Sequence, residues 1–510
     1  MSNLVPLYII LPLATAFLIP IFGRLIKGFQ KMLLTLVLLF LSIITLVLLS
    51  NGITETTTYQ VGGWEPVNGV PIAIYLVFDG LSALLLLITS LIGFLAAFYS
   101  ISYMKRYTAE NNFYALLALM ITGMNGVILT GDMFNMYVFL EIAVIASYAL
   151  VAFGVEKNEL EASFKYQVLG GVASLLILFA IGLLYWQTHT LNIADISAQL
   201  PDTNNNFFLL FTQILLISGF GLKAAMIPFH AWLPDAHSSA PSPISAMLSG
   251  VLIKAIGIYA ILRLFFNMFT ITYEISMLIT VIGTLSMVIG GFLAIAQWDM
   301  KRMFAYSSIS QMGYVTIGIG MGMILIATGG NTSIASLAIA GGLFHLINHA
   351  TFKSLLFLNA GAIEYRTGTR NMKMMGGLAG KMPITSTTSL GASLSISGIP
   401  PFNGFFSKLI IIIAAIKGGF ILIAVLAVII SIVTIAYFLR FQRYAFFNKE
   451  TFSKKIKEVP FTMCFSMIFL LALCLILSLL AIPGIREVFL GPAVDVLIET
   501  TIYSSSIIGL

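Results

Sequence analysis

The sequence predicts an all-α polytopic membrane protein, and three observations lead to that fold class. Hydrophobic residues make up 59% of the 510 residues, charged residues make up only 9%, and the mean hydropathy is +1.02. A soluble domain carries about 25% charged residues, so water cannot be the solvent for most of this surface. Apolar runs of about 20 residues, the length that crosses a bilayer core as a helix, recur along the chain. These runs are too long for barrel strands, so a helix bundle is expected.

Turn residues and charge clusters divide these runs into about 14 predicted helices. The first lacks a basic segment before it and an obvious small-residue cleavage site, so we interpret it as a membrane helix and not as a removable signal. Asp79 starts the third helix and is a candidate cap, and Asp132 lies in the turn before the fifth. Proline interrupts the seventh helix at Pro228 and the twelfth at Pro401. The predicted ranges are 4–22, 32–50, 76–103, 112–130, 133–154, 165–186, 207–227, 241–266, 272–297, 303–327, 333–361, 384–416, 418–440 and 461–483.

The basic residues of the loops predict how the helices are oriented. Alternate loops carry nineteen Lys and Arg, and the opposite loops carry three, namely Arg263, Lys417 and Arg486. The positive-inside rule places the basic loops in the cytoplasm. With an even number of helices both termini then lie outside a cell membrane. This distribution also accounts for the net charge of +6, so no nucleic-acid partner is expected.

A faint internal repeat predicts two inverted units of five helices each. Ala162-Ser-Phe-Lys165 is matched by Ala350-Thr-Phe-Lys353, and each copy is followed by a lysine and a Pro-Phe break, 58 residues on at Lys223 and 55 residues on at Lys408. The copies are five helices apart, an odd number, so their orientations are opposite. Paired broken helices in inverted repeats are typical of transporters. The predicted segments are 1–110, 111–268 for the first repeat, 269–442 for the second and 443–510.

Several ionisable residues remain inside the apolar helices once the loops are assigned. An intramembrane charge costs about 2.5–3.5 kcal/mol on insertion scales, so each of these residues needs a reason. Neutralising a lysine at pH 7 from its reference pKa of about 10.4 costs a similar amount, about 4–5 kcal/mol, so a buried lysine is poised between its two protonation states. Such groups can pass protons. The candidates are Glu141, Lys223, Lys254, His345, His349, Lys353 and Lys408.

Each candidate also has a structural interpretation. Glu141 and Lys223 could form a static ion pair, although four intramembrane lysines face that single glutamate. His345 and His349 share a helix face and could be core histidines, while the other histidines offer no matching pair for a metal. Lys353 and Lys165 lie closer to helix ends, where lysines snorkel or pair with acids.

The motifs that contain these residues resemble the antiporter-like subunits of respiratory complex I. The resemblance covers about residues 75–445 and extends to the large subunits of Mrp-type sodium/proton antiporters and of membrane-bound hydrogenases. It is carried by Asp132-Met-Phe-Asn-Met-Tyr-Val-Phe-Leu-Glu141, Gly221-Leu-Lys223-Ala-Ala-Met-Ile-Pro228-Phe-His230-Ala-Trp-Leu-Pro-Asp235-Ala-His237, Lys301-Arg-Met-Phe-Ala-Tyr-Ser-Ser-Ile-Ser-Gln311, His345-Leu-Ile-Asn-His349-Ala-Thr-Phe-Lys353 and Thr367-Gly-Thr-Arg370.

The resemblance implies a role for each buried group. Glu141 and Lys223 would form the pair that controls lysine protonation, Lys254 would be the central carrier, the histidines would continue the axis, and Lys408 would be the exit group. The resemblance favours the D-type subunit of Mrp antiporters or its hydrogenase-complex equivalent, with other membrane subunits as partners and H⁺, with or without Na⁺, as the cargo. A membrane component of complex I and a stand-alone secondary transporter are the alternatives.

Other classes of function lack their own sequence features. An electron-transfer protein would need paired axial ligands or a cysteine cluster, whereas Cys464 and Cys474 are ten residues apart on one predicted helix. A substrate carrier would gather its polar residues at one depth, whereas here they are spread over several helices. We therefore expect no cofactor and no metal in this chain, and energy that comes from partner subunits or from an ion gradient.

Overall fold

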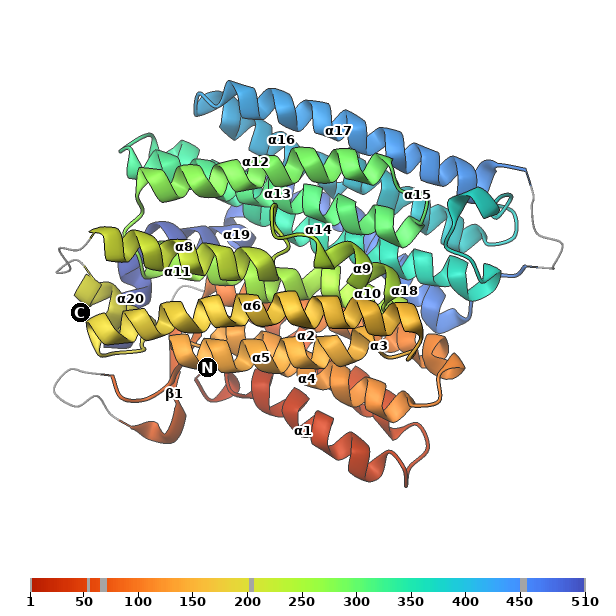
Figure 1. Cartoon of the computed structure of the whole chain (residues 1–510), viewed down its shortest axis with the longest axis horizontal. Coiled ribbons are helices and arrows are strands. Elements are labelled where there is room, and N and C mark those ends of the chain that lie inside the picture. The colour runs from red at the N-terminus through yellow and green to blue at the C-terminus, as the bar shows by residue number, and fades with distance from the viewer. Residues whose placement is uncertain (1, 53–55, 65–70, 201–205, 450–455, 509–510) are drawn as a thin grey trace.

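A computed structural model describes residues 2–52, 56–64, 71–200, 206–449 and 456–508, and its helices lie side by side along the longest axis of the molecule (Figure 1). Within these ranges twelve helices are long and apolar enough to cross a membrane. Of the other two predicted spans, 207–227 holds one shorter helix, Asn206–Lys223, and 384–416 is divided into two, Pro383–Ser397 and Asn403–Lys417. The all-α membrane fold is confirmed, and continuous helices account for twelve of the roughly 14 predicted spans. Of the residues used for the orientation, Lys454 and Lys455 lie outside the described ranges.

The first half of the chain forms the lower part of the bundle in Figure 1, from α1 upward to α6 and α8. Leu, Ile and Phe side chains are exposed on the outer faces of α2 and α6, as is common for helices that cross a membrane. The helices are α1 Leu7–Phe22, α2 Phe29–Ser50, α3 Gly80–Tyr103, α4 Glu110–Leu129, α5 Met133–Val151, α6 Lys157–Thr188, α7 Ile193–Gln199, α8 Asn206–Lys223, α9 Trp232–Ser239, α10 Ser242–Met247 and α11 Tyr259–Asn267.

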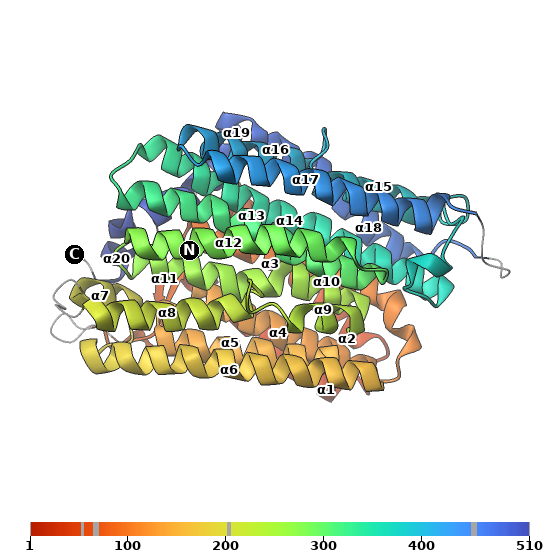
Figure 2. The same cartoon turned by 45° about the horizontal axis from the view of Figure 1, so that its top comes forward.

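The second half forms the upper part, where α12, α16 and α17 cover the bundle (Figures 1 and 2). Within it α14 is buried along most of its length, and this helix carries both candidate histidines. The helices are α12 Tyr273–Ile295, α13 Met300–Ala327, α14 Thr332–Thr367, α15 Pro383–Ser397, α16 Asn403–Lys417, α17 Ile421–Gln442, α18 Phe461–Ile476, α19 Pro483–Ile498 and α20 Thr500–Ile508.

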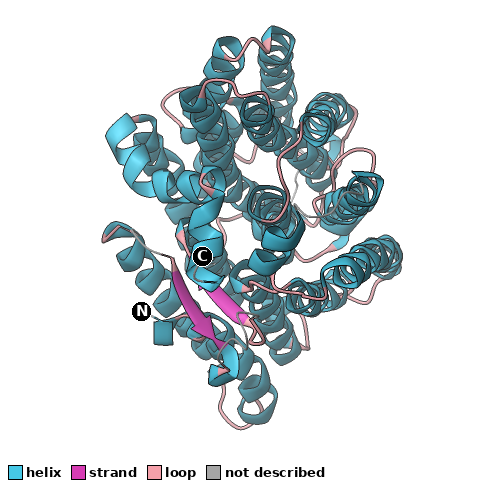
Figure 3. Cartoon of the chain, turned by 90° about the vertical axis from the view of Figure 1, so that its left-hand side faces the viewer, coloured by secondary structure: helices cyan, strands magenta, loops and turns pink. Residues whose placement is uncertain are grey.

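A two-stranded sheet lies at the end of the bundle that carries the C-terminus (Figure 3). Strand β1, Thr57–Gln60, pairs antiparallel with β2, Tyr75–Phe78, with Thr57 opposite Phe78. The prediction of a third helix over 76–103 was wrong for residues 76–78. Short apolar runs rich in aromatic and β-branched residues fit either element, and here pairing with β1 decides for a strand.

Acidic caps start α3 and α5 where the sequence suggested. Asp79 accepts a hydrogen bond from the Ser82 amide at 2.8 Å, and the Ser82 hydroxyl accepts one from the Asp79 amide at 2.7 Å, which forms a capping box. Asp132 accepts from the Asn135 amide at 2.7 Å. Burial raises the pKa of the Asp132 carboxyl, and the hydrogen bond from Asn135 opposes that effect.

Asp79 has a second partner, because its carboxylate forms an ion pair with Arg263 of α11 at 2.7 Å and both side chains are 1% exposed. The assignment of Arg263 to a loop was wrong, since α11 continues to Asn267. The Arg263 guanidinium also lies over the ring of Tyr503 in α20, 4.5 Å from its centroid. Asn267 donates to the carbonyl of Val496 in α19 at 2.8 Å. The last two helices are thereby held against the bundle.

Both proline breaks are present. Between α8 and α9 lie eight residues that include Pro228, and the Trp232 indole donates back to the Leu222 carbonyl at 2.9 Å. Between α15 and α16 the chain turns at Gly398, whose φ of 79° lies in the left-handed region that glycine tolerates, and then passes through Pro401. Each break ends a helix in mid-bundle and leaves carbonyl groups without their helical partners.

The eighth predicted helix is continuous but not regular. Between α10 and α11 it contains two π-helical turns, Leu248–Leu252 and Lys254–Ile258. Single π-turns are frequent at functional sites because the extra residue re-aims the neighbouring side chains. Lys254, one of the candidates, begins the second of these turns.

Candidate functional site

Three helices bring Glu141 and Lys223 together around a serine. Glu141 projects from α5, and Lys223 is the last residue of α8, with 1% of its side chain exposed. Ser174 of α6 donates to the Glu141 carboxylate and accepts from Lys223 Nζ, the latter at 2.9 Å. Lys223 also donates to the Gly170 carbonyl at 3.0 Å, and its Nζ lies 3.8 Å from Glu141 Oε1. The predicted pair exists, and its closest contacts run through the serine.

Sequence reasoning missed Ser174 because serine gives little signal in an apolar helix. Its hydroxyl oxygen also lies 3.0 Å from the Gly170 carbonyl four residues earlier, so its one hydrogen can be donated either to that carbonyl, a common partner for a buried serine, or to Glu141. The cost of placing a charge in the membrane, which made the lysines conspicuous, therefore does not identify Ser174. Only the arrangement of α5, α6 and α8 reveals that the same hydroxyl lies between an acid and a lysine.

Lys254 is fully buried and has no acidic neighbour among the ion pairs of the described residues. Its Nζ donates to the Ser249 carbonyl at 2.6 Å, within the preceding π-helical turn. The helix that carries it packs closely against the end of α8, since a Cβ on Gly257 would lie 2.7 Å from the Cβ of Ala224. Glycine at this position lets the Lys223 and Lys254 segments touch.

His345 of α14 is held by two side chains from neighbouring helices. Its Nδ1 lies 2.9 Å from the Ser407 hydroxyl of α16, and its Nε2 lies 3.2 Å from the Gln311 amide oxygen of α13. Both contacts suit a neutral ring as well as a protonated one, because a hydroxyl can donate or accept.

His349 and His237 are both completely buried, and neither ring nitrogen of either residue has a hydrogen-bond partner among the described residues. The His349 ring contacts Phe352, and the His237 ring stacks on Phe357 with 5.1 Å between centroids. Buried polar atoms are nearly always paired with protein or water. These two imidazoles therefore mark places in the bundle that suit water.

Lys408 of α16 uses the second helix break. Its Nζ donates to the carbonyl of Ile396, at the end of α15, at 2.9 Å and lies 4.8 Å from the centroid of the Tyr314 ring. Asn403, the first residue of α16, donates to the Asn348 side chain of α14 at 2.8 Å and so holds the break beside the histidine helix. Freed carbonyls at membrane depth thus provide the cation's acceptor.

Lys353 is as buried as Lys254. Its Nζ donates to the Phe304 carbonyl at 2.7 Å and to the Ser307 hydroxyl, both on α13. No ion pair with an acid is found for Lys254, Lys353 or Lys408 within the described part of the chain. The alternative that Lys353 snorkels to a helix end does not fit a side chain with no exposed surface.

Electrostatic proximity groups the remaining candidates into one cluster. His349 interacts with Lys254, Lys353, His345 and His237, and His345 also interacts with Lys408. The structure therefore arranges the predicted residues as a Glu141–Lys223 pair and a second, larger cluster around α14. The contact between Gly257 and Ala224 joins the two regions.

Lys165 and Asp235 lie elsewhere, near the end of the bundle where the loops rich in Lys and Arg lie, which we call the basic end. Lys165 is half-exposed and pairs with Glu161 at 2.7 Å and with Asp235 at 3.2 Å. Asp235 also binds Arg302 at 2.7 Å. These pairs fit the paired-lysine interpretation of Lys165, and they tie α6, α9 and α13 together.

His230 lies within the first break and is half-buried, and its Nδ1 has no hydrogen-bond partner among the residues that the structure describes. Pro228 and Pro401 are both exposed at their breaks. Within the described ranges no three His, Cys, Asp or Glu side chains are grouped as metal ligands. What the site offers instead is a set of protonatable amines and imidazoles held by neutral carbonyls and hydroxyls.

Comparisons with known proteins place the chain in a family. Residues 130–434 match the family described as NADH:quinone oxidoreductase/Mrp antiporter, TM, and residues 64–114 match the N-terminus of chain 5 of NADH-ubiquinone oxidoreductase (complex I). The D subunit of a Na⁺/H⁺ antiporter from Alkalihalophilus pseudofirmus is 31% identical over 100% of both chains. The N subunit of an NADH-quinone oxidoreductase from Desulforudis audaxviator is 35% identical over 76% of this chain and 74% of its own.

Solved structures agree with these relatives. A chain of the Mrp complex from a Dietzia species superposes with a TM-score of 0.88 at 26% identity, covering 100% of this chain and 99% of its own. A chain of an archaeal membrane-bound sulfane sulfur reductase gives the same TM-score at 29% identity, covering 99% and 100%. Since the first family match spans more than half of the residues, this multi-pass membrane protein belongs to the NADH:quinone oxidoreductase/Mrp antiporter family of membrane subunits.

Proposed function

We propose that this chain is a proton-translocating membrane subunit of a multi-subunit cation/proton antiporter. Protons would pass between Glu141, Lys223, Lys254, His345, His349 and Lys408. The observation that carries the proposal is the Lys223 ammonium site, where one acid, one serine and one carbonyl meet in the bundle interior. The other buried lysines have neutral acceptors, so nothing locks them in the charged state.

The geometry supports a specific sequence of events at the first pair. With a proton on Lys223 Nζ, the ammonium donates to Gly170 and Ser174, and the Glu141 carboxylate stabilises the charge from 3.8 Å. When the proton leaves, the amine becomes neutral, and Glu141 retains the hydrogen bond from Ser174. Glu141 therefore favours the loaded lysine, and changes in its distance would control when the proton is released.

The cluster around α14 would carry the proton onward. A lysine on a carbonyl acceptor needs a second base nearby to release its proton, and His349 and His345 interact electrostatically with Lys254 and Lys408. Imidazole titrates near neutral pH and can receive a proton at one nitrogen and give it up at the other. The unpartnered nitrogens of His349 and His237 supply places where water can link these groups.

We infer the host complex from the share of each chain that the alignments with the relatives cover. The Alkalihalophilus antiporter relative aligns over all of both chains, whereas the quinone oxidoreductase relative aligns over about three quarters of each. The A1 subunit of a Staphylococcus aureus Na⁺/H⁺ antiporter is 33% identical over 95% of this chain, which spans 62% of that relative. We therefore favour an antiporter complex that exchanges H⁺ with Na⁺, with a complex I-like host as the alternative. Mass spectrometry of proteins that co-purify with the tagged chain separates the two hosts.

The same proposal includes membrane and topology. The chain would lie in the cell membrane with both termini outside, and Figure 1 marks the two termini at the same end of the bundle. The two breaks, one in each half, fit the inverted repeats proposed for 111–268 and 269–442. Cysteines introduced at Lys417 and Lys381 and labelled from one side of sealed vesicles would test this orientation.

Alanine substitutions of two lysines test the function. We expect Lys223→Ala and Lys408→Ala to abolish Na⁺-driven proton movement while the complex still assembles, because each removes one protonatable group. The measurement is fluorescence of a pH-sensitive dye in everted vesicles that contain the whole complex. Lys417→Ala is the matched control, since this lysine ends the helix of Lys408 but is exposed. Full transport by either assembled variant would contradict the proposal.

A further inference from the structure

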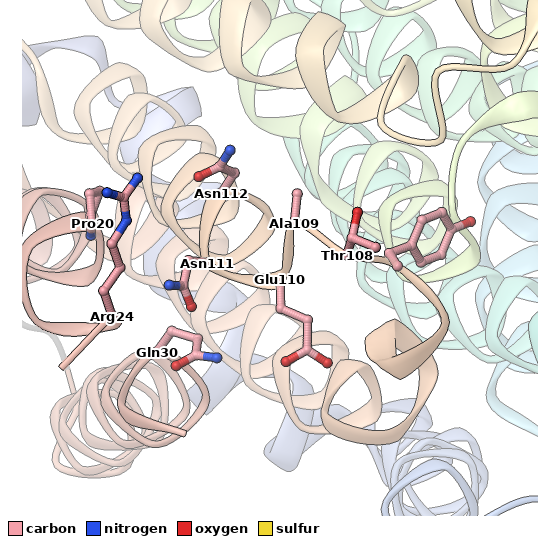
Figure 4. A pocket seen from close by; sticks show the side chains of 9 residues that line it. Pro20, Arg24, Gln30, Thr108, Ala109, Glu110, Asn111 and Asn112 are labelled. Carbon is pink, nitrogen blue, oxygen red and sulfur yellow. The ribbon is translucent and has the colours of Figure 1, made fainter. Parts of the chain in front are cut away.

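A polar pocket separate from the buried lysines opens at the basic end of the bundle. It has a volume of about 390 Å³ and lies between the end of α1, the start of α2 and the start of α4. Figure 4 shows that its labelled side chains come from these three segments and gather around one space. The polar ones are Arg24, Gln30, Thr108, Glu110, Asn111 and Asn112.

One of these side chains lacks a partner although it is buried. Gln30 is 6% exposed, and its Oε1 accepts no hydrogen bond from the described residues. A buried acceptor without a donor is rare in folded proteins. The pocket beside it therefore suits a ligand that carries a hydroxyl or another hydrogen-bond donor.

The pocket also favours negative charge. The Glu110 carboxylate is neutralised by Lys31, whose Nζ lies 2.7 Å away. Arg24 is exposed and makes no ion pair with any residue in the described ranges. In Figure 4 this guanidinium lies beside Pro20, and the Asn111 side chain lies between it and the Gln30 side chain. A guanidinium with nearby amides is well suited to a phosphate group.

The surface around the pocket is apolar where a lipid chain would lie. Leu25 is 77% exposed and Ile26 is 51% exposed, directly after Arg24, and Phe17 on the outer face of α1 is 64% exposed. A membrane protein exposes such side chains to hydrocarbon. An arginine bordered by them is therefore positioned at the level of lipid headgroups.

We propose that this pocket binds the headgroup of an anionic glycerophospholipid with a free hydroxyl, of the phosphatidylglycerol type. Arg24 and Asn111 would hold the phosphodiester, the headgroup hydroxyl would donate to Gln30 Oε1, and the acyl chains would follow the apolar face of α1. The site is independent of the proposed proton path, so this proposal can be tested without measuring transport.

Native mass spectrometry of the purified full-length chain tests the site. The chain is titrated with phosphatidylglycerol, phosphatidylcholine or phosphatidylethanolamine of equal chain length. We expect binding of phosphatidylglycerol to exceed that of phosphatidylcholine about tenfold, since phosphatidylglycerol gains the hydroxyl contact and lacks the quaternary ammonium that would lie near Arg24. Arg24→Gln is expected to lower phosphatidylglycerol binding about tenfold, and Asn111→Leu by less. Lys27→Gln, an exposed basic neighbour that does not line the pocket, should change it less than twofold.

Four results would overturn the proposal. Equal binding of phosphatidylcholine would remove the anionic requirement, and so would equal binding of phosphatidylethanolamine, which has no net charge although its ammonium can donate to Gln30 Oε1. A loss with Lys27→Gln as large as that with Arg24→Gln would indicate general surface charge. Displacement of bound lipid by inorganic phosphate at the same concentration would identify a free-anion site. Each variant is compared only as monodisperse protein, and the two substitutions at different residues guard against a local folding defect.

Discussion

Ser174 gives the sharpest test of the proposed first step, because its hydroxyl bonds both members of the Glu141–Lys223 pair. The change is Ser174→Ala, which removes the hydroxyl and leaves the backbone of α6 unaltered. Lys223 then keeps the Gly170 carbonyl at 3.0 Å and the Glu141 carboxylate at 3.8 Å. The pair is weakened but not abolished, so a graded effect is expected.

The magnitude follows from these contacts. A hydrogen bond to a charged group contributes about 1.5–3 kcal/mol net. The direct attraction across 3.8 Å is about 4 kcal/mol at an effective dielectric constant near 20, and it remains in the variant. We therefore expect a loss worth one charged hydrogen bond. If that loss falls on the step in which Lys223 takes up its proton, the rate falls between about tenfold and about a hundredfold.

The assay compares initial rates of Na⁺-driven proton movement in everted vesicles with equal amounts of assembled complex. Ser174→Thr is the matched variant, since threonine keeps a hydroxyl that can bond within the helix in the same way. Its rate is expected to stay near that of the unaltered chain. The reasoning fails if Ser174→Ala transports at the full rate while Lys223→Ala is inactive, or if the threonine variant is as slow as the alanine variant.

Two further predictions concern stability and packing. Asp79→Ala leaves Arg263 buried without its counter-charge, so we expect the free energy of unfolding in mixed micelles to fall by about 3–5 kcal/mol. Replacing both residues by leucine should restore part of that loss, and a double variant less stable than Asp79→Ala would contradict the account. Gly257→Ala forces a new Cβ to within 2.7 Å of Ala224, so we expect a loss of about 1–3 kcal/mol in the same assay and slower transport. Gly171→Ala, where a Cβ meets nothing within 4 Å, should be neutral or stabilising, and equal losses in both would refute the packing argument.

The helical membrane fold could be predicted from the sequence because the bilayer imposes one requirement on every span, an apolar run of sufficient length. The predicted elements were wrong where strand pairing or a buried ion pair, and not hydropathy, determined the structure. Tyr75–Phe78 is apolar but pairs as a strand with Thr57–Gln60, a long-range contact that hydropathy does not contain. Arg263 was counted with the loops because it lies three residues from the predicted end of its helix, and hydropathy does not reveal the buried ion pair with Asp79.

The site could be predicted in part for a similar reason. A lysine inside an apolar run is conspicuous, so Lys223, Lys254 and Lys408 were found individually. Their acceptors were not, since the partners of Lys254 and Lys408 are backbone carbonyls that every residue possesses. The repeat also suggested that Lys165 and Lys353 are alike, yet Lys165 is half-exposed and Lys353 is fully buried. Their short motifs match, but the position of each helix in the bundle differs.

The contact of Tyr503 with Arg263 has a consequence for how the protein is made. The ring that covers the guanidinium is encoded 240 residues after the arginine and 424 residues after Asp79. During synthesis the ion pair remains uncovered on this side until α20 has left the ribosome and packed against the bundle. Closure of that end of the molecule is therefore a late step in biogenesis, and early release of the chain before residue 503 would leave a buried charge pair open to water.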